Sequence, residues 1–312
     1  MLLTHGASDT SLPPVALTIG NFDGIHRGHQ AMLERLMAES QRQGLPSCVL
    51  TFEPHPREFF APRSAPTRLA SLREKLELLA ARGIGRVHVE RFTGSFAALA
   101  PEAFVERVLA KRLRARWLLI GEDFRFGAKR AGDAALLKGL AGRHGCEVEI
   151  MSAVTRAGVR VSSSAVRAAL ASGDLALAEA LLGRPYAISG RVVHGRKLGR
   201  ALGFATANVQ LKHNRPPLTG IYAVKVYGIG PAPRSGVASL GVRPTITASG
   251  RAVLEAHLFD FSDDLYAAHV RVEFLHKIRD EEKYSNLDAL KAQIARDCEA
   301  AKSFLLEHRD AR

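Results

Sequence analysis

The stretch Thr18-Ile19-Gly20-Asn21-Phe22-Asp23-Gly24-Ile25-His26-Arg27-Gly28-His29-Gln30 decides the fold of the first half of the chain. The apolar run at 15–19 predicts a short buried strand. A turn rich in glycine and Asx residues follows, and a helix-forming run begins near residue 29. Such a turn binds anions, because free backbone N–H groups and the positive end of the helix dipole face the ligand. We therefore expect a phosphate-binding turn, formed by Gly20, Asn21, Phe22 and Asp23.

Two histidines flank a glycine at that helix end, as His26-x-Gly28-His29. Their imidazoles can donate hydrogen bonds to charge that builds on a phosphorus under attack. Gly28 is expected to leave room for a nucleotide. Neither a P-loop sequence nor a G-x-G-x-x-G pattern after a strand occurs in the chain. The motif after a first strand resembles the signature of the nucleotidyltransferase superfamily; a pair of surface histidines in a turn is the alternative.

Length and composition favour a two-domain globular protein. The chain has 312 residues, of which 46% are apolar and 24% charged. No run of about 18 apolar residues predicts a membrane span, and the N-terminus lacks the segments of a signal peptide. Cys48, Cys146 and Cys298 lie far apart without a C-x-x-C pair. This spacing argues against a zinc site or a disulfide framework and predicts a cytoplasmic location.

The net charge of +13 raises the question of a nucleic-acid partner. The arginines that supply most of this charge are scattered, and no stripe of basic and aromatic residues suited to stacking bases is present. A phosphate-rich small substrate also favours positive clefts. We therefore expect no nucleic-acid partner and no membrane contact.

Strand and helix patterns alternate in the first half. Apolar runs predict strands at 15–20, 47–52, 86–90, 116–120 and 147–151. Helical periodicity predicts helices at 29–43, 69–82, 101–113, 132–144, 163–171 and 174–182. Gly173 and Asp174 are the expected caps between the last two helices. The alternation indicates a doubly wound α/β parallel sheet, of the nucleotidyltransferase-like kind.

The pattern changes where Gly183 and Pro185 end the last of these helices. Short β-rich runs follow and indicate a small antiparallel β-barrel. Its strands are expected at 186–194, 221–228, 236–240, 252–261 and 268–275. A terminal helix is expected at about 286–307, capped by Ser285 or Asn286. The predicted domains are 1–184 and 185–312.

Two loops of the first half are candidate binding sites because they follow predicted strands. In Thr51-Phe52-Glu53-Pro54-His55-Pro56-Arg57, the prolines are expected to keep the backbone extended and to present His55 and Arg57. In Gly121-Glu122-Asp123-Phe124-Arg125-Phe126-Gly127, the phenylalanines are expected to form a slot for a flat ring, with Asp123 on its polar edge. Solvated side chains and a self-packed loop, respectively, are the alternatives.

A third motif, Arg160-Val161-Ser162-Ser163-Ser164-Ala165-Val166-Arg167, opens a predicted helix. Hydroxyls at a helix N-terminus can cap it or bind phosphate. Arg160 and Arg167 provide planar donors suited to phosphate oxygens. One serine is explained by an ordinary cap, but three with flanking arginines are not.

In their order and spacing, these segments resemble the FMN adenylyltransferase module of the bacterial bifunctional riboflavin kinase/FAD synthetase family. The resemblance spans the first domain and implies that the FMN phosphate attacks the α-phosphorus of ATP. It assigns transition-state stabilisation to His26, His29, Ser163 and Arg167. The family's Ser-Ser-Thr-x-x-Arg element has Ser164 in place of the threonine here, which keeps the hydroxyl. Further implied binding residues are Gly20, Asn21, Phe22, Asp23, Gly28, His55, Asp123, Phe124, Arg160 and Ser164.

The second half contains a segment at 190–208 that is dense in glycine and basic residues. Glycines allow backbone amides to approach a phosphate, and Lys197 adds charge. Thr206 and Asn208 place two neutral oxygens on one face if the chain is extended, and such hard ligands suit Mg²⁺. A glycine-rich hairpin with a basic tip is the alternative for this segment alone.

Further motifs are G-I-Y-A-V, G-V-A-S-L-G-V-R-P-T, L-E-A-H-L-F-D-F, D-L-Y and I-R-D-E-E-K-Y. With the glycine-rich segment they resemble the riboflavin kinase module of the same family over about residues 184–300. The resemblance implies that Thr206 and Asn208 hold Mg-ATP and that Glu255 is the base on the riboflavin 5′-hydroxyl. Burial on an inward-facing strand would raise the pKa of Glu255 and suit a base; an outward charge is the alternative. The other implied binding residues are Gly195, Lys197, Gly203 and Arg279.

One position departs from the family pattern: Ala205 stands where the family has proline before the threonine. Proline would pre-set the backbone, so its loss is expected to cost up to ~1 kcal/mol of preorganisation and to remove no ligand.

The resemblance thus implies an enzyme that converts riboflavin to FMN and FMN to FAD with ATP and Mg²⁺. Three alternatives stay open. A nucleotidyltransferase with another acceptor, such as a phosphopantetheine, leaves the second domain unexplained. A flavin-binding regulator has no need of the candidate catalytic residues, and an RNA-binding protein would show steeply salt-dependent binding. A weak or transient homo-oligomer also stays open.

Overall fold

The computed structural model describes residues 1–6, 12–194, 204, 206–211, 215–242, 252–261, 263 and 265–308. The chain forms two compact units: Met1–Pro66 with Leu72–Ser162, and Thr67–Ser71 with Ser163–Arg312. Helices α7 (Ser163–Ser172) and α8 (Leu175–Leu182) therefore group with the second unit. The domain boundary expected after residue 184 stays a prediction.

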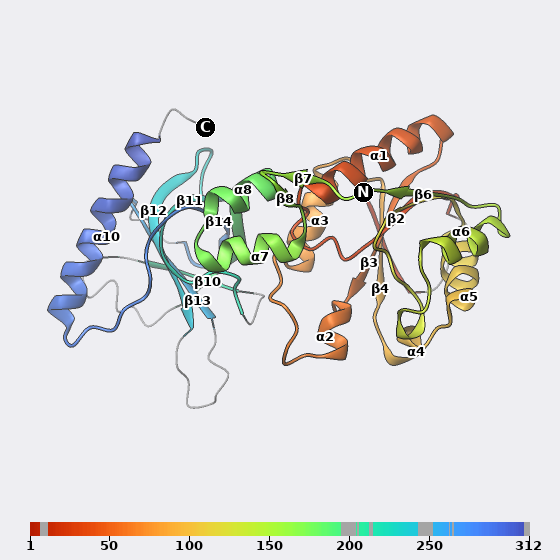
Figure 1. Cartoon of the computed structure of the whole chain (residues 1–312). Coiled ribbons are helices and arrows are strands. Elements are labelled where there is room, and N and C mark those ends of the chain that lie inside the picture. Colours follow the sequence, from red (N-terminus) through yellow and green to blue (C-terminus); the bar gives the residue numbers. More distant parts are fainter. Residues whose placement is uncertain are drawn as a thin grey trace. The chain divides into compact units, whose positions relative to one another are not determined.

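The first unit is built on a six-stranded parallel sheet with the order β1-β4-β3-β2-β5-β6 (Figure 1). Its strands are β1 (Leu2–His5), β2 (Val15–Ile19), β3 (Ser47–Glu53), β4 (Arg86–Arg91), β5 (Ala115–Gly121) and β6 (Glu147–Met151). All but β1 were expected. The edge strand β1 gave no signal because it has four residues, and its two leucines are exposed rather than buried.

The strand order reverses between β2 and β5. From β2 the chain proceeds to β3 and β4 on one side, and β5 then lies against the other side of β2. Open α/β sheets bind ligands at the carboxyl ends of the strands at such a reversal. The histidine motif follows β2 and the Asp123 loop follows β5, so the topology brings these two motifs together.

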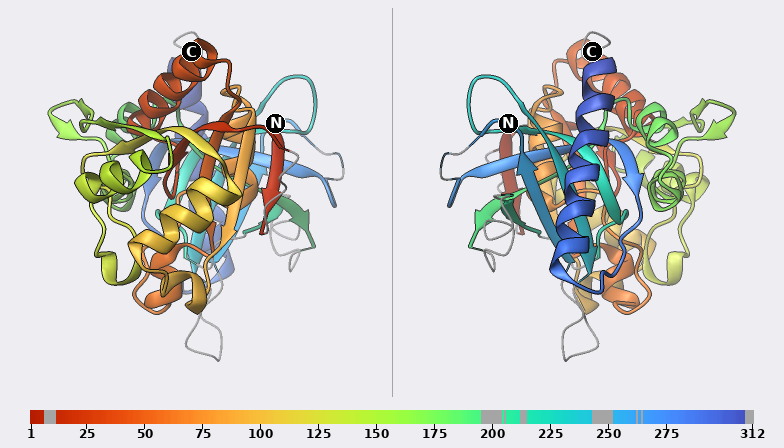
Figure 2. Two further views of the ribbon diagram at one scale, coloured as in Figure 1. Left: turned by 90° about the vertical axis from the view of Figure 1, so that its right-hand side faces the viewer. Right: turned by 90° about the vertical axis from the view of Figure 1, so that its left-hand side faces the viewer.

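Helices cover both faces of this sheet, which confirms the doubly wound arrangement (Figure 2). On one face, α1 (Arg27–Gln43) and α3 (Leu72–Ala80) bury leucines against Trp117. On the other face pack α5 (Pro101–Phe104), the π-helix η1 (Val105–Arg112) and α6 (Ala134–Gly142). Full burial of each such leucine contributes about 1.5–3 kcal/mol.

The backbone is helical from Pro56 onward, so the expectation that the prolines keep this segment extended is wrong. Helix α2 (Pro56–Phe60) begins there with His55 as its N-cap. His55 Nδ1 accepts a hydrogen bond from the Arg57 N–H at 3.1 Å, and the Glu58 carboxylate accepts one from the His55 N–H at 3.3 Å. Proline is favoured at a first helical position, because its missing N–H has no intrahelical partner there.

Four further short elements were not expected. They are α4 (Gly94–Ala97), the 3₁₀ turn η2 (Ala128–Arg130) and the two-residue strands β7 (Thr155–Arg156) and β8 (Val159–Arg160). Elements this short lack enough residues for a periodic signal.

The second unit is a closed barrel with the strand order β10-β13-β12-β11-β14-β9, and all its pairs are antiparallel. The strands are β9 (Tyr186–Val193), β10 (Thr206–Gln210), β11 (Gly220–Tyr227), β12 (Arg234–Val242), β13 (Ala252–Leu258) and β14 (His269–Arg279). The expected barrel is confirmed, whereas β10 was not expected as a strand.

Helix α10 (Leu287–Glu307) lies along the outside of the barrel and packs on β11 and β12 (Figure 2). Its N-cap is Asn286, whose Oδ1 accepts a hydrogen bond from the Ala289 N–H at 2.8 Å. The helix is also fixed to β14, because Arg279 forms a bidentate ion pair with Asp297 at 2.8 and 2.6 Å. The caps expected at Asp174 and Gly183 of α8 are present.

Candidate active sites

The two histidines of the first motif lie ring to ring at the start of α1. His26 is the N-cap, and its Nδ1 accepts a hydrogen bond from the His29 N–H at 3.3 Å. Since Nδ1 is the acceptor, the proton of neutral His26 is on Nε2. The rings stack with centroids 3.7 Å apart and an interplanar angle of 13°. The pair therefore forms one block at the positive end of the helix.

His29 is held in the neutral form. Burial keeps the pKa of its imidazole well below the ordinary value, and repulsion from His26 and Lys75 lowers that pKa further. Within the described part of the chain, its Nδ1 is buried without a hydrogen-bond partner. This leaves Nε2 as the candidate nitrogen of His29 for contact with a substrate.

The turn before the histidines is tightly packed. Phe22 is fully buried with φ of +48°, and its ring centroid lies 4.9 Å from that of His29. A Cβ on Gly20 would lie 3.1 Å from the Phe22 ring, so Gly20 permits this close approach. Asp23 is also buried, whereas Asn21 is exposed.

Gly28 packs against protein on two sides. A Cβ there would lie 3.2 Å from His26 Nδ1 and 3.6 Å from the Val161 carbonyl oxygen. The absent side chain therefore leaves room first of all for the His26 ring. The close approach of a nucleotide at Gly28 stays a prediction.

A small cavity of about 300 Å³ opens beside the histidines. His26, Gly28 and His29 form one wall, and Arg160 and Ser162 approach from the β7–β8 side. Arg160 forms an ion pair with Asp123 at 2.9 Å and lies 3.8 Å from Glu122. Asp123 thus contacts an arginine in this structure, whereas its predicted role was to fix the edge of a ring.

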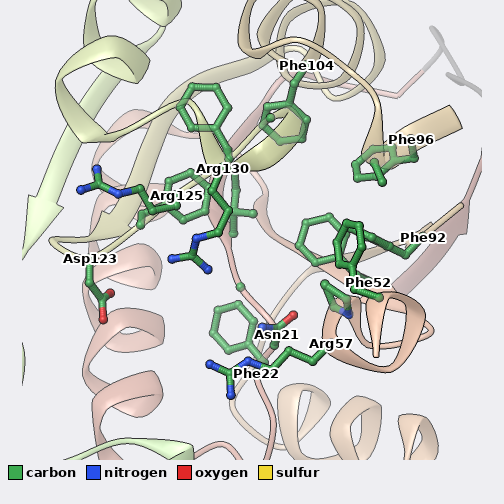
Figure 3. Close-up of a pocket in the computed structure, with 18 of the residues that line it drawn as sticks. Asn21, Phe22, Phe52, Arg57, Phe92, Phe96, Phe104, Asp123, Arg125 and Arg130 are labelled. Atoms are coloured by element: carbon green, nitrogen blue, oxygen red, sulfur yellow. The ribbon is translucent and has the colours of Figure 1, made fainter. Parts of the chain in front are cut away.

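A larger cavity of about 900 Å³ adjoins the first one and is walled by aromatic rings (Figure 3). Phe124 and Phe126 stack there with centroids 5.8 Å apart. Basic side chains reach toward the space between the rings from its rim (Figure 3); they are Arg57, Arg125 and Arg130. Phe22 was expected as a binding residue, whereas the aromatic residues that sequence reasoning missed are Phe52, Phe60, Phe92, Phe96 and Phe104. They come from separate loops and helices, and the sequence pattern alone does not gather them.

Other predicted residues of the first site are not among the residues that line these two cavities. His55 caps α2 and lines neither cavity. Ser163, Ser164 and Arg167 belong to α7 in the second unit, where Arg167 Nε donates a hydrogen bond to the Thr67 carbonyl at 2.5 Å. Within the first unit, Arg160, Val161 and Ser162 of that motif line the small cavity beside the histidines, and the roles of Ser163, Ser164 and Arg167 stay predictions.

In the barrel, strand register aligns the candidate metal ligands with the candidate base. Asn208 of β10 is paired with Glu255 of β13, and Thr206 is paired with His257. Side chains alternate between faces along a strand, so all four residues share one face. Directly opposite residues of an antiparallel pair have Cβ atoms about 4.5–5.5 Å apart. Thr206, Asn208 and Glu255 thus form a compact group of oxygen-bearing side chains.

This face is the outer one, so the expected inward orientation of Glu255 is wrong. Leu254 and Ala256 of β13 are buried, whereas Glu255 is half-buried on the opposite face. The alternation of the strand fixes this, because its apolar residues occupy every second position. The next strand places Ser239 beside Glu255 on the same face.

The other predicted residues of the second site are Arg279 and residues of the glycine-rich segment. Arg279 is engaged in its bidentate pair with Asp297 and donates from Nη1 to the Asp280 carbonyl at 2.9 Å. Gly195, Lys197, Gly203 and Ala205 lie outside the described residues.

Comparisons with known proteins match both units. A family model described as FAD synthetase matches residues 8–165, and one described as riboflavin kinase matches residues 182–305. The chain is 50% identical to the bifunctional riboflavin kinase/FMN adenylyltransferase of Escherichia coli (strain K12) over 96% of each chain. It belongs to this bifunctional family.

Other relatives span nearly the whole chain. The family member of Haemophilus influenzae is 47% identical over 93% of this chain and 94% of its own length. A solved structure described as a macrolide-efflux protein from Streptococcus pneumoniae has a TM-score of 0.80 and 29% identity, and covers 95% of this chain and 97% of its own. Within the described residues, no helix is both long and apolar enough to span a bilayer.

Proposed function

We propose that this chain catalyses two successive reactions of flavin cofactor synthesis. The second unit transfers a phosphate from ATP to riboflavin and forms FMN, and the first unit transfers AMP from ATP to FMN and forms FAD with release of pyrophosphate. The observation that carries this proposal is that both family models match one chain, each over a unit with its own candidate site.

Adenylyl transfer is supported by the way the two cavities of the first unit meet. The small cavity, which has the histidine pair and Arg160 in its lining, suits the ATP phosphates, and the aromatic cavity suits a flavin ring. Both cavities are lined by His29, Met32, Gly121 and Asp123, so their junction lies at His29. The FMN phosphate is already ionised at neutral pH, so it needs no general base to attack the α-phosphorus.

The histidines are placed to stabilise charge rather than to remove a proton. Neutral His26 carries its proton on Nε2, and Nε2 is the candidate donor of His29, whose Nδ1 is buried without a hydrogen-bond partner among the described residues. Two N–H donors fixed in one stacked block can bind an oxygen of the α-phosphate as its charge builds. Arg160, now paired with Asp123, is a further candidate for the phosphates. Ser163 and Arg167 remain candidates on the sequence motif alone.

Phosphoryl transfer is supported by the register of β10 and β13. Glu255 accepts the proton of the riboflavin 5′-hydroxyl as that oxygen attacks the γ-phosphorus. Thr206 and Asn208 fit Mg²⁺, because their side chains offer neutral oxygens on β10, the strand that pairs with the strand of Glu255. When bound with ATP, Mg²⁺ neutralises charge on the phosphates. We also propose a cytoplasmic site of action, since all three cysteines are buried free thiols.

One experiment tests both reactions. The purified protein is incubated with riboflavin, ATP and Mg²⁺, and the flavins are separated by chromatography over time. We expect FMN to appear first and FAD later. FAD formed only from supplied FMN would remove the kinase half of the proposal, and no product from either flavin would favour a flavin-binding protein without catalysis.

A further inference from the structure

Lys75 is a buried lysine that neither proposed reaction uses. It lies on α3 in the unit that carries His26 and His29, and only 4% of its surface is exposed. Burying an ammonium group costs several kcal/mol unless it is well hydrogen-bonded, so an apolar residue would suit a purely structural position better. One hydrogen bond of Lys75 leads toward the adenylyl-transfer site.

A short relay of hydrogen bonds connects Lys75 with the turn after β2. Lys75 Nζ donates to Thr51 Oγ1 at 3.2 Å, and Thr51 Oγ1 donates to the Asn21 carbonyl at 3.2 Å. Thr51 is fully buried on β3. Asn21 precedes Phe22, and Phe22 and Ile25 have φ angles of 48° and 43°, which side-chain-bearing residues rarely adopt. The relay therefore anchors a turn with an unfavourable backbone conformation.

The same turn supports His29. The buried ring of Phe22 lies against the His29 ring, with centroids 4.9 Å apart. The ammonium also acts on His29 through space, because its charge adds to burial and to His26 in lowering the pKa of His29. Lys75 itself lines neither cavity of the first unit. The turn and His29 are therefore the routes by which we expect it to influence a substrate.

We propose that Lys75 is a positioning residue for adenylyl transfer: through Thr51 it holds the turn of Asn21 and Phe22 and thereby keeps His29 in place. This inference rests on the proposed function of the first unit. The kinase reaction of the same molecule provides an internal control, because its candidate residues lie in the other unit.

The first test is Lys75→Met, with Lys138→Met as the matched control. Lys138 is an exposed lysine of α6 in the same unit. We expect Lys75→Met to lower kcat for FAD formation from FMN about tenfold or more, because small displacements of catalytic groups are costly. KM for FMN and ATP should change less than kcat, and FMN formation from riboflavin should be unchanged. A kcat within about twofold of the control would overturn the proposal.

The second test separates the relay from the charge. Thr51→Val removes the relay and keeps the ammonium, so kcat should fall while the pKa of His29, followed by NMR of its ring, changes little. Lys75→Met should raise that pKa by removing a repelling charge. The double variant should be no slower than Lys75→Met alone, since residues acting through one path are not additive. Effects that multiply would contradict the relay.

With both variants, the proposal can be tested even if Lys75→Met misfolds or if the proposed function of the first unit is wrong. If Lys75→Met does not fold, Thr51→Val decides, and a normal kcat in that variant overturns the proposal. If the unmodified protein forms no FAD from FMN, the proposed function fails. The NMR titration then still tests the effect of Lys75 on His29. An unchanged pKa of His29 in Lys75→Met would contradict the proposed action of Lys75 on that ring.

Discussion

The two candidate sites of this molecule are assembled in different ways. In the first unit, the histidines and the turn before them come from one continuous stretch, and the loop after β5 joins them because the strand order reverses there. In the second unit, Asn208 and Glu255 are far apart in sequence and meet only because β10 pairs with β13 in one register. The first site depends on local turn and helix geometry, and the second on non-local strand pairing.

This difference indicates which kind of structural change should disrupt each site. A residue of the first site can be replaced without disturbing the sheet below it. In the second site, a slip of β10 by one residue would turn Thr206 and Asn208 to the opposite face of the barrel. Damage to the barrel should therefore remove the kinase reaction, whereas the adenylyl-transfer reaction should depend on a few side chains.

The largest expected effect comes from breaking each site separately. Glu255→Gln should lower FMN formation about 10²–10⁴-fold, the usual range for loss of a general base, and spare FAD formation from FMN. His29→Asn should lower FAD formation from FMN and spare FMN formation from riboflavin. Rates of both reactions with each variant test this, with His144→Asn, on an exposed histidine, as the control. Loss of both activities in a folded variant would contradict two independent sites.

A second effect should reach the kinase reaction through stability. Asp297 is buried and pairs with Arg279, so Asp297→Ala leaves a guanidinium without its carboxylate and should destabilise the second unit by about 3 kcal/mol. FMN formation should be lost at a lower temperature than FAD formation from FMN. Glu299→Ala on the exposed face of the same helix is the control and should leave the unfolding midpoint unchanged. Equal loss of both reactions on heating would contradict separate unfolding.

The sequence alone predicted most of the regular elements of both units, because their signals are local. The alternation of strands and helices, the cap at Asn286 and the break at Gly183 were all readable as patterns of neighbours. The edge strand β1 escaped because it is short and half-exposed. Helix α2 escaped because the prolines were expected to keep the backbone extended, whereas Pro56 is a first helical residue.

Site residues were predictable only where a motif is continuous. His26, His29 and Gly28 could be named from one stretch, and so could Thr206 and Asn208. Most of the aromatic cavity could not, since Phe52, Phe92 and Phe96 converge through tertiary packing alone. The predicted orientation of Glu255 was also wrong. The alternation along a strand does not show which face is buried in the core until the neighbouring strands are known.

A smaller effect should come from Gly28→Ala, which tests the local geometry of the first site. The new methyl group would crowd His26 Nδ1, so the ring must shift by a few tenths of an ångström and weaken its hydrogen bond to His29. We expect kcat for FAD formation to fall severalfold. The stability of the fold should not fall together with kcat, because alanine favours a helix by about 1 kcal/mol over glycine. Thermal unfolding and FAD kinetics on the same sample separate the two effects, and loss of stability without loss of rate would show that Gly28 serves packing alone.

The smallest effect should be a dependence of stability on pH that is confined to the first unit. The pKa of His29 is lowered on folding below the value of 6.5 that applies to an ordinary histidine. The unfolded chain therefore binds a proton more readily than the folded one, so unfolding becomes easier as pH falls through about 6.5, and stability is regained as pH rises above it. His29→Asn removes the titrating ring and should flatten this dependence, whereas His144→Asn should leave it. Denaturant unfolding followed by the single Trp117, which lies in the first unit, measures it directly. An unchanged slope in His29→Asn would assign the pH dependence to other groups and would remove burial of His29 as the reason that its ring stays neutral.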